Sequence, residues 1–276
     1  MVVSIALEGY GPVTVACART TLGAIALLTL MWVLKRPMPN RNTIPHILPM
    51  GLLNTALPFL LLSWGQQYVP SAFAGISMAA LPLFVLPLAH FFSDEKMNYN
   101  NLFGVIIGFI GALVLIGPGL ANLGQGTAPL AQLACLAASM SYAVSSVMTR
   151  RCPPIDPITL AAMTLLVGAV ALIPVMLIIE GIPKWNGTIS GYAIIFLGFV
   201  PTGLAAMLRV QVVRSAGSVF MTLVNYQVPL WSVIFGWLVL SENLPLRFFA
   251  ALALILCGLA ISQWRNTVTR IFGPRA

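Results

Sequence analysis

Charged side chains are scarce in this sequence. Fourteen lysines and arginines and six aspartates and glutamates are spread over 276 residues, so the charged fraction is only 7%. A soluble domain carries about 25% charged residues, and 59% of this chain is hydrophobic. Such a chain cannot cover a globule with polar surface. The composition therefore excludes an ordinary soluble domain and predicts that the lipid bilayer is its solvent.

Several kinds of reactive site are also missing. The two histidines are isolated near predicted helix ends, and the four cysteines form no Cys-x-x-Cys pair, so we expect packing cysteines and no metal site. None of the three lysines follows a glycine-rich phosphate loop, which argues against an ATPase. An enzyme would need a nucleophile with a base, or a metal cluster, at membrane depth. We therefore expect no enzymatic activity and no cofactor. The basic residues gather on no amphipathic face, so we expect no nucleic-acid partner.

Acidic residues are absent from the middle of every apolar run. Because all six lie at predicted helix ends, the sequence offers no buried acid for a proton relay and no anionic cage for a cationic drug. We expect Glu95 and Glu242 to cap the helices that follow them, since each falls just before one. The six are Glu8, Asp94, Glu95, Asp156, Glu180 and Glu242.

What is present is a series of apolar runs of about membrane length. A helix needs about 20 apolar residues to span a bilayer, and turn and helix-stop compositions separate the runs. No loop between them is long enough for a separate soluble domain. The nine runs are Val13–Leu34, Ile47–Gln67, Ala72–Phe92, Leu102–Ile116, Leu130–Thr149, Ile158–Ile179, Ile189–Val213, Val219–Leu240 and Phe248–Gln263.

The run around Pro229 belongs to a long internal repeat. Pro229 lies 147 residues after Pro82, and the same offset aligns other residues without a gap: Gly51 with Gly198, Thr55 with Thr202, Ser71 with Ser218, Phe73 with Phe220, Glu95 with Glu242, and Gly111 with Gly258. Self-similarity over a long period inside apolar helices is typical of a transporter built from two halves. We assign residues 1–121 to the first half and residues 127–276 to the second.

The repeat also interprets the short segment before the first run. The residues from Tyr10 to Ala16 resemble those from Ile155 to Ala161, which places Met1 opposite Ser146, inside a helix. We expect an all-α, polytopic membrane protein with an inverted five-helix repeat. Its ten-helix architecture lacks most of the first helix, so nine full spans are visible. We expect either that the native chain begins upstream or that Met1–Leu7 is pulled toward an interface.

Basic residues predict the orientation in the membrane. Ten of them lie in loops on one side, whereas only Lys184 and Arg247 lie on the other. The positive-inside rule then places the C-terminus in the cytoplasm. An odd number of helices in each half gives the halves opposite orientations, a form that supports alternating access. The ten are Lys35, Arg36, Arg41, Lys96, Arg150, Arg151, Arg214, Arg265, Arg270 and Arg275.

Several local patterns resemble a known family. Gln67-Tyr-Val-Pro-Ser-Ala, Ala80-Leu-Pro-Leu, Asp94-Glu and the glycines from Gly104 to Gly111 resemble the EamA-type branch of the drug/metabolite transporter superfamily. Arg19 resembles an arginine common in that family's second helix. The resemblance covers the chain from Val2 on, except for the missing first helix. It implies a substrate cavity between the halves, lined mainly by the third, fourth, eighth and ninth of ten helices, with the first and sixth contributing. It also implies export or exchange of small metabolites, amino acids among them, at the plasma (inner) membrane.

Polar and aromatic residues in these helices form the candidate substrate site. Two interpretations remain open for the small and polar stripe around Pro229: close helix packing, or a cavity wall where a proline frees backbone carbonyls. Pro82 and Pro229 interrupt helical hydrogen bonding and are the candidate gates. The substrate-binding candidates are Arg19, Asn54, Trp64, Gln67, Met78, Tyr142, Asn225, Tyr226 and Gln227.

Two arginines lie within apolar runs. A charge at the centre of a membrane helix costs about 3 kcal/mol or more. Arg209 lies one turn from a helix end and is expected to extend its charged group to the interface. Arg19 lies two turns deep, as either a structural hydrogen-bond hub or the partner of a substrate carboxylate. Because no buried acid accompanies it, a neutral, zwitterionic or anionic solute fits better than a cation.

The predicted function is a secondary membrane transporter that exports small organic metabolites, amino-acid-like or carboxylate-bearing, by alternating access. The alternative, motivated by the missing helix, is a non-transporting fragment or regulatory membrane protein. Membrane lipid is an expected partner besides the substrate. The glycine face of Gly104, Gly108 and Gly111 favours packing within the chain and also allows a homodimer.

Overall fold

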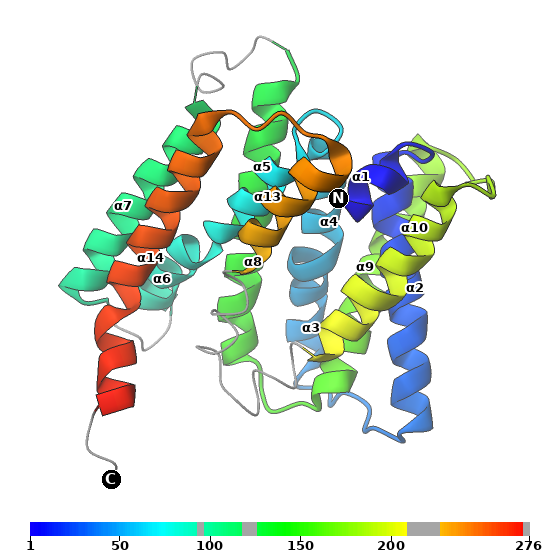
Figure 1. Cartoon of the computed structure of the whole chain (residues 1–276). Helices are drawn as coiled ribbons and strands as arrows, with labels where there is room; N and C mark the ends of the chain where they lie inside the picture. Colours follow the sequence, from blue (N-terminus) through cyan, green and yellow to red (C-terminus); the bar gives the residue numbers. More distant parts are fainter. Residues whose placement is uncertain (93–96, 118–125, 209–226, 273–276) are drawn as a thin grey trace.

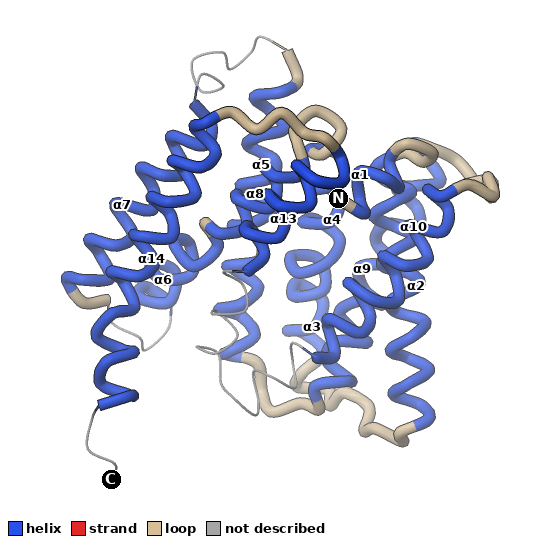
Figure 2. Tube along the Cα trace, in the orientation of Figure 1, coloured by secondary structure: helices blue, strands red, loops and turns tan. Residues whose placement is uncertain are grey.

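Every regular element in the computed structural model is a helix over the residues that it describes, which are 1–92, 97–117, 126–208 and 227–272 (Figures 1 and 2). Seven helices in these ranges are long and apolar enough to cross a membrane, and two shorter apolar helices follow them. The all-α, multi-pass membrane class predicted from composition is therefore confirmed.

The described helices follow the predicted apolar runs in order. Some ends differ: α7 begins before Leu102, because the Asn98 side chain accepts a hydrogen bond from Asn101 N (2.8 Å) and starts the helix, and α14 runs beyond Gln263. The elements are α1 (Val2–Leu7), α2 (Pro12–Val33), α3 (Ile44–Gly51), η1 (Leu52–Ala56), α4 (Leu57–Gly65), α5 (Ser71–Ala79), α6 (Leu81–Phe92), α7 (Tyr99–Ile116), α8 (Ala128–Arg151), α9 (Pro157–Ile179), α10 (Ile189–Leu197), η3 (Gly198–Leu204), α13 (Gln227–Leu240) and α14 (Leu246–Phe272).

Three of the predicted spans are not uniform α-helices. The span that contains α3 and α4 widens to a π-helical segment at η1, and the span that begins with α10 does so at η3. Such segments are rare and often mark functional sites. The span that contains Pro82 is interrupted between α5 and α6, where Ala80 N donates to Ser77 O (3.1 Å). Because proline has no N–H to continue the helix, a break beside Pro82 follows from the sequence.

Helices distant in the sequence lie side by side. In Figure 1, α7 runs along α14 at one side of the molecule, α2 lies near α9 and α10 at the other, and α8 lies between them. α5 packs against α13, and the short α1 packs against α10, where Ala6 is fully buried in an apolar cluster with Val15 and Leu197. The two largest apolar clusters surround Phe73 and Leu165. Large apolar side chains on the outer surface, such as Phe103 and Ile178, are exposed and suit a lipid environment.

Candidate functional site

Arg19 lies buried in the middle of α2, with only 8% of its surface exposed. Its Nε donates a hydrogen bond to Thr202 Oγ1 of η3 (3.1 Å), and its guanidinium carbon lies 3.9 Å from the ring centroid of Phe59 in α4. Tyr142 of α8 packs against the same apolar cluster as Phe59 and lies near Arg19. Four different spans therefore meet at this one cation.

The Arg19 charge has no acidic partner among the described residues, in which the one ion pair joins Arg36 to Asp156. A buried charge needs either a counter-ion or a set of hydrogen bonds, because its transfer from water is costly. The bond to Thr202 and the stack on Phe59 orient the guanidinium but carry no negative charge. The arrangement therefore suits a ligand that brings an anionic group of its own.

The two π-helical segments each hold a buried threonine against another helix. Thr202 of η3 accepts the Arg19 hydrogen bond, while Thr55 Oγ1 of η1 donates to Thr164 O of α9 (3.2 Å). Glycines make these close approaches possible. A Cβ on Gly23 would lie 2.9 Å from Thr202 Cγ2, and one on Gly168 would collide with Thr55 Oγ1.

The other predicted site residues are spread more widely. Asn54 in η1 is half-buried, as is Met78 of α5, whose sulfur lies 3.9 Å from Ser139 Oγ. Trp64 packs against the cluster around Phe73 and meets the Tyr68 ring edge-on at 5.5 Å. Both predicted glutamines, Gln67 and Gln227, are exposed. Asn225, Tyr226 and Arg209 lie outside the described residues. Among the predicted residues, the structure thus brings Tyr142 to Arg19 and assigns Trp64 to a different apolar cluster.

Phe59 and Thr202 were missed as site residues by sequence reasoning. Thr202 had a signal, because it aligns with Thr55 in the repeat. Phe59 had none, because one aromatic residue in an apolar run looks like any other until the guanidinium above it is seen.

Two carboxylates cap helices far away in the sequence. Glu180, at the end of α9, accepts hydrogen bonds from Val13 N (3.0 Å) and Thr14 N (2.8 Å) at the start of α2. Glu242, after α13, accepts from Ser71 N (2.6 Å) and Ala72 N (3.1 Å) at the start of α5. The expectation that Glu242 caps the helix after it is therefore wrong. Ser241 has a φ of +52°, and this left-handed residue turns the chain back over α13 instead of forward to α14. Glu95 lies outside the described residues.

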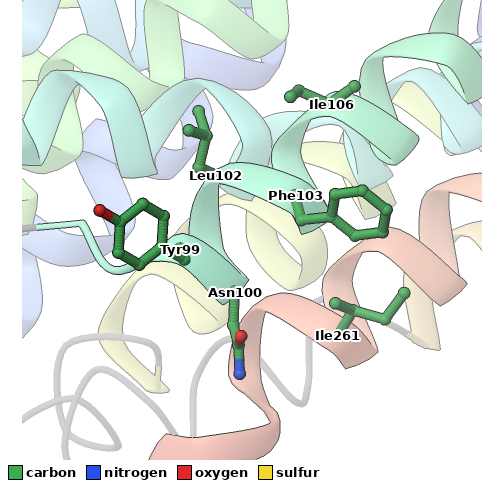
Figure 3. A pocket seen from close by; sticks show the side chains of 6 residues that line it. All are labelled: Tyr99, Asn100, Leu102, Phe103, Ile106 and Ile261. Carbon is green, nitrogen blue, oxygen red and sulfur yellow. The ribbon is translucent and has the colours of Figure 1, made fainter.

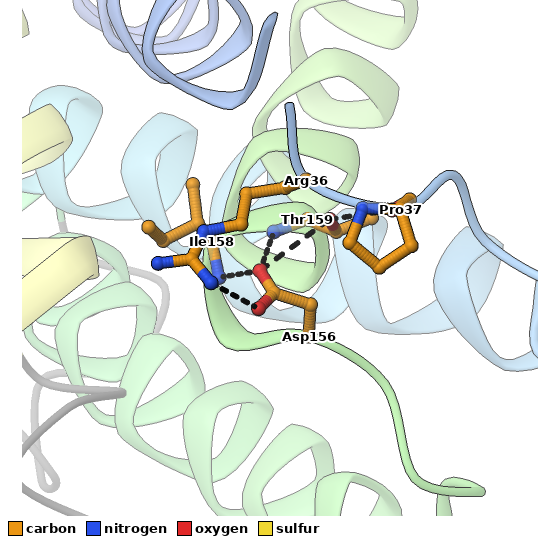
Figure 4. Close-up of polar contacts among 5 residues, drawn as sticks. All are labelled: Arg36, Pro37, Asp156, Ile158 and Thr159. Carbon is orange, nitrogen blue, oxygen red and sulfur yellow. Dashed lines mark hydrogen bonds and ion pairs between the residues drawn. The ribbon is translucent and has the colours of Figure 1, made fainter. Parts of the chain in front are cut away.

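Asp156 caps α9 at the end that the basic residues predict to be cytoplasmic (Figure 4). Its Oδ1 accepts from Ile158 N (3.0 Å) and Thr159 N (3.1 Å), and its Oδ2 lies 3.6 Å from the Arg36 guanidinium. Thr159 Oγ1 also donates to Pro37 O (2.8 Å). These contacts tie the segment after α2 to the start of α9, which indicates a structural role.

Two surface pockets lie away from Arg19. One of about 350 Å³ lies between α7 and α14 and is lined by Tyr99, Asn100, Leu102, Phe103, Ile106 and Ile261 (Figure 3). The other, of about 550 Å³, lies at the end of α2 and is lined by Met31, Trp32, Val33, Lys35, Arg36 and Met38. None of the predicted site residues lines either pocket.

Comparison with known proteins gives consistent matches over nearly the whole length. The sequence model of the EamA-like transporter family matches residues 1–117 and 129–263. "Uncharacterized transporter YoaV" of Bacillus subtilis (strain 168) is 25% identical over 263 residues, which is 94% of this chain and 90% of that protein. A "Probable terminal-alkyne amino-acid exporter" of Streptantibioticus cattleyicolor is 28% identical over 113 residues, 41% of this chain and 38% of that protein. A crystal structure covering 96% of this chain and 92% of its own matches with a TM-score of 0.69 at 19% identity, a likeness of fold alone.

Proposed function

Because the chain belongs to the EamA-like transporter family, we propose that it is a secondary transporter that exports small carboxylate-bearing solutes such as amino acids. It acts by alternating access in the plasma (inner) membrane, with its C-terminus in the cytoplasm, and it catalyses no covalent reaction. The similarity to a protein named as an amino-acid exporter supports this substrate class. The ten-to-two bias of basic loop residues supports the orientation.

The observation that carries the proposal is the buried guanidinium of Arg19. Its Nε is fixed by Thr202 and its face is fixed by Phe59, while no acid of the described residues pairs with it. Guanidinium–carboxylate pairs are among the strongest charge-assisted hydrogen bonds, and they gain geometric specificity from the planar fork. A substrate carboxylate would neutralise a charge that no acid of the described residues compensates.

The contacts around the two π-helical segments support the inverted repeat of residues 1–121 and 127–276. Gly51 approaches Val167 and Thr164 O so closely that a Cβ would lie 2.6 Å and 2.9 Å from them. Its repeat partner Gly198 approaches Leu22 in the same way. Each half therefore inserts the same kind of segment into the other. Such exchange of roles about a central site is the basis of alternating access.

The two halves differ at one position that suits substrate recognition. Arg19 precedes Thr164 by 145 residues, the offset that aligns the start of α2 with the start of α9. Arg19 bonds to Thr202 of the second half, and the Thr164 carbonyl accepts the bond from Thr55 of the first. The two halves thus make similar contacts, but only the first half places a cation, Arg19, at this position. A solute with a negative end would therefore bind in one orientation, with that end at Arg19.

The break beside Pro82 supports a gating role for that helix. α5 and α6 are separate helices that meet at Ala80, and a break of this kind beside a proline is where a helix bends. Pro229 is buried in α13, and residues 209–226 before that helix lie outside the described range. Both prolines remain candidate gates.

The test is solute flux through the purified chain in proteoliposomes. Vesicles loaded with a radiolabelled amino acid should exchange it for external amino acids or small carboxylates, and quaternary ammonium ions should not compete. Vesicles containing the Arg19→Ala variant, inserted to the same density, should exchange at least about tenfold more slowly. Transport of organic cations with rejection of carboxylates would overturn the substrate class. An absence of flux for every solute would favour the alternative, a non-transporting membrane protein.

A further inference from the structure

Glu242 holds the start of α5 from the opposite half of the chain. Its two carboxylate oxygens accept hydrogen bonds from the amides of Ser71 (2.6 Å) and Ala72 (3.1 Å). α5 has no side-chain cap of its own, because Pro70 occupies the N-cap position. The first amides of a helix lack partners within it and attract negative charge. Glu242 therefore satisfies donors that would otherwise need water.

The chain after α13 is shaped to present this carboxylate. The left-handed Ser241 lets Glu242 N donate to Gly236 O (3.0 Å), which folds the residue back onto its own helix. Gly236 leaves the space that the carboxylate occupies, since a Cβ there would lie 2.5 Å from Glu242 Oε2 and 3.4 Å from Ser71 Oγ. The Ser71 hydroxyl is buried beside it and forms no hydrogen bond. Ser241, Gly236 and Ser71 are thus the small residues that surround the Glu242 carboxylate.

Further along from this contact, α5 and α13 remain closely packed. Gly75 of α5 lies against Ser232 of α13 so tightly that a Cβ on the glycine would collide with the serine side chain. α5 is also held in the apolar core by α14 and α8, where the Phe73 ring lies 5.8 Å from that of Phe248 and Ser139 Oγ donates to Ser77 O (2.8 Å). Among the described helices, α13 packs mainly against α5.

We infer that Glu242 is the lock of a gate formed by α5 and α13 at this end of the transport path. While the carboxylate holds the start of α5, the two helices close the path between the halves. When it lets go, α13 can move away from α5. Glu242 is half-exposed, so water can replace the amides when the contact opens and the lock can be reversible. The inference rests on the proposed transport function.

Glu180 supplies a matched control. It caps α2 through Val13 N and Thr14 N in the same manner, but α2 and α9 are unbroken helices packed along one another. Loss of this carboxylate should loosen one helix end and leave the α5–α13 contact unchanged. The two glutamates therefore separate the effect of capping from the effect of locking.

The gate can be measured without transport. In a background with the four cysteines replaced by serine, spin labels at Tyr68→Cys and Asn243→Cys report the distance between the start of α5 and the end of α13 in nanodiscs. Both positions are exposed. Glu242→Gln, which loses the charge and one acceptor, should raise the ratio of long to short distances by about tenfold, because bonds to a charged group are strong. Gly236→Ala keeps the charge but fills its space, and should give the same shift.

Glu180→Gln should leave the distance distribution as in the parent. A Glu242→Gln distribution identical to that of the parent would overturn the lock, and so would an equal opening in Glu180→Gln. If the parent moves no solute yet Glu242→Gln opens the label distance, the proposed transport function fails and the lock remains. If the parent transports and neither Glu242→Gln nor Gly236→Ala changes the distance, the lock alone fails.

Discussion

Replacing Arg19 by leucine distinguishes a substrate-binding arginine from a structural hub. The substitution removes a hydrogen bond to a charged group, worth about 1.5–3 kcal/mol, and a cation–π contact, worth about 0.5–2 kcal/mol. It also removes a charge whose insertion at the centre of a membrane helix costs about 2.5–3.5 kcal/mol. These terms oppose one another. The free energy of unfolding of Arg19→Leu should therefore lie within about 2 kcal/mol of the parent value, even though the residue is buried and bonded.

Transport should respond differently from stability. A solute carboxylate loses its only buried cationic partner among the described residues, so exchange in proteoliposomes should fall at least about tenfold. Arg19→Lys, which keeps the charge but not the planar fork, should retain part of the activity. Thr202→Val is the matched control, because it removes the Nε acceptor and leaves the charge in place.

The assays are thermal unfolding of purified protein in detergent and initial exchange rates at equal insertion. If Arg19→Leu loses much more than about 2 kcal/mol of stability, while Arg19→Lys has the stability and the transport rate of the parent, then the arginine is a structural hub. If Arg19→Leu exchanges amino acids at the parental rate, the proposed site is wrong.

Three further predictions concern orientation, packing and cysteine chemistry. In a cysteine-free background, a membrane-impermeant maleimide added to intact cells should label Asn186→Cys and not Arg151→Cys, and the reverse result would invert the proposed topology. Gly104→Ala should destabilise the protein by about 1–3 kcal/mol in thermal unfolding, because the new methyl group would meet the Gly258 carbonyl and push α7 from α14; unchanged stability would contradict this close contact. Burial raises the pKa of the Cys152 thiol, so its alkylation rate, followed with the other three cysteines replaced by serine, should rise at a higher pH than that of an unstructured cysteine peptide, and a rise at the same pH would refute the effect of burial.

The sequence predicted the spans well because their cause is local. A run of about 20 apolar residues must be satisfied as a helix in lipid whatever its neighbours do, and Pro82 breaks a helix by lacking one N–H. Arg19 stood out for the same reason, since a charge in such a run is costly in any fold. These inferences needed no knowledge of which helices touch.

The features that could not be predicted from the sequence depend on contacts between distant segments. Glu242 lies 171 residues from Ser71, and its direction is set by the left-handed backbone of Ser241. Serine rarely adopts that conformation, so the adjacent helix α14 was the reasonable but wrong expectation. Phe59 likewise became a site residue only because α4 passes over α2. The π-helical turns at η1 and η3 had no signal beyond the aligned threonines.

The positions of three described acids explain why none of them neutralises the Arg19 charge. Asp156, Glu180 and Glu242 are each occupied by backbone amides at the start of a helix, where the helix dipole favours a negative charge. None of them is available to a cation in the middle of the molecule. Among the described residues, the Arg19 guanidinium therefore has no carboxylate partner, and a bound carboxylate would relieve the cost of its burial. A ligand shifts a conformational equilibrium only through its differential affinity for the two states. A site whose charge is compensated only when substrate is present provides such a difference, and so links loading at Arg19 to the movement of the helices around it.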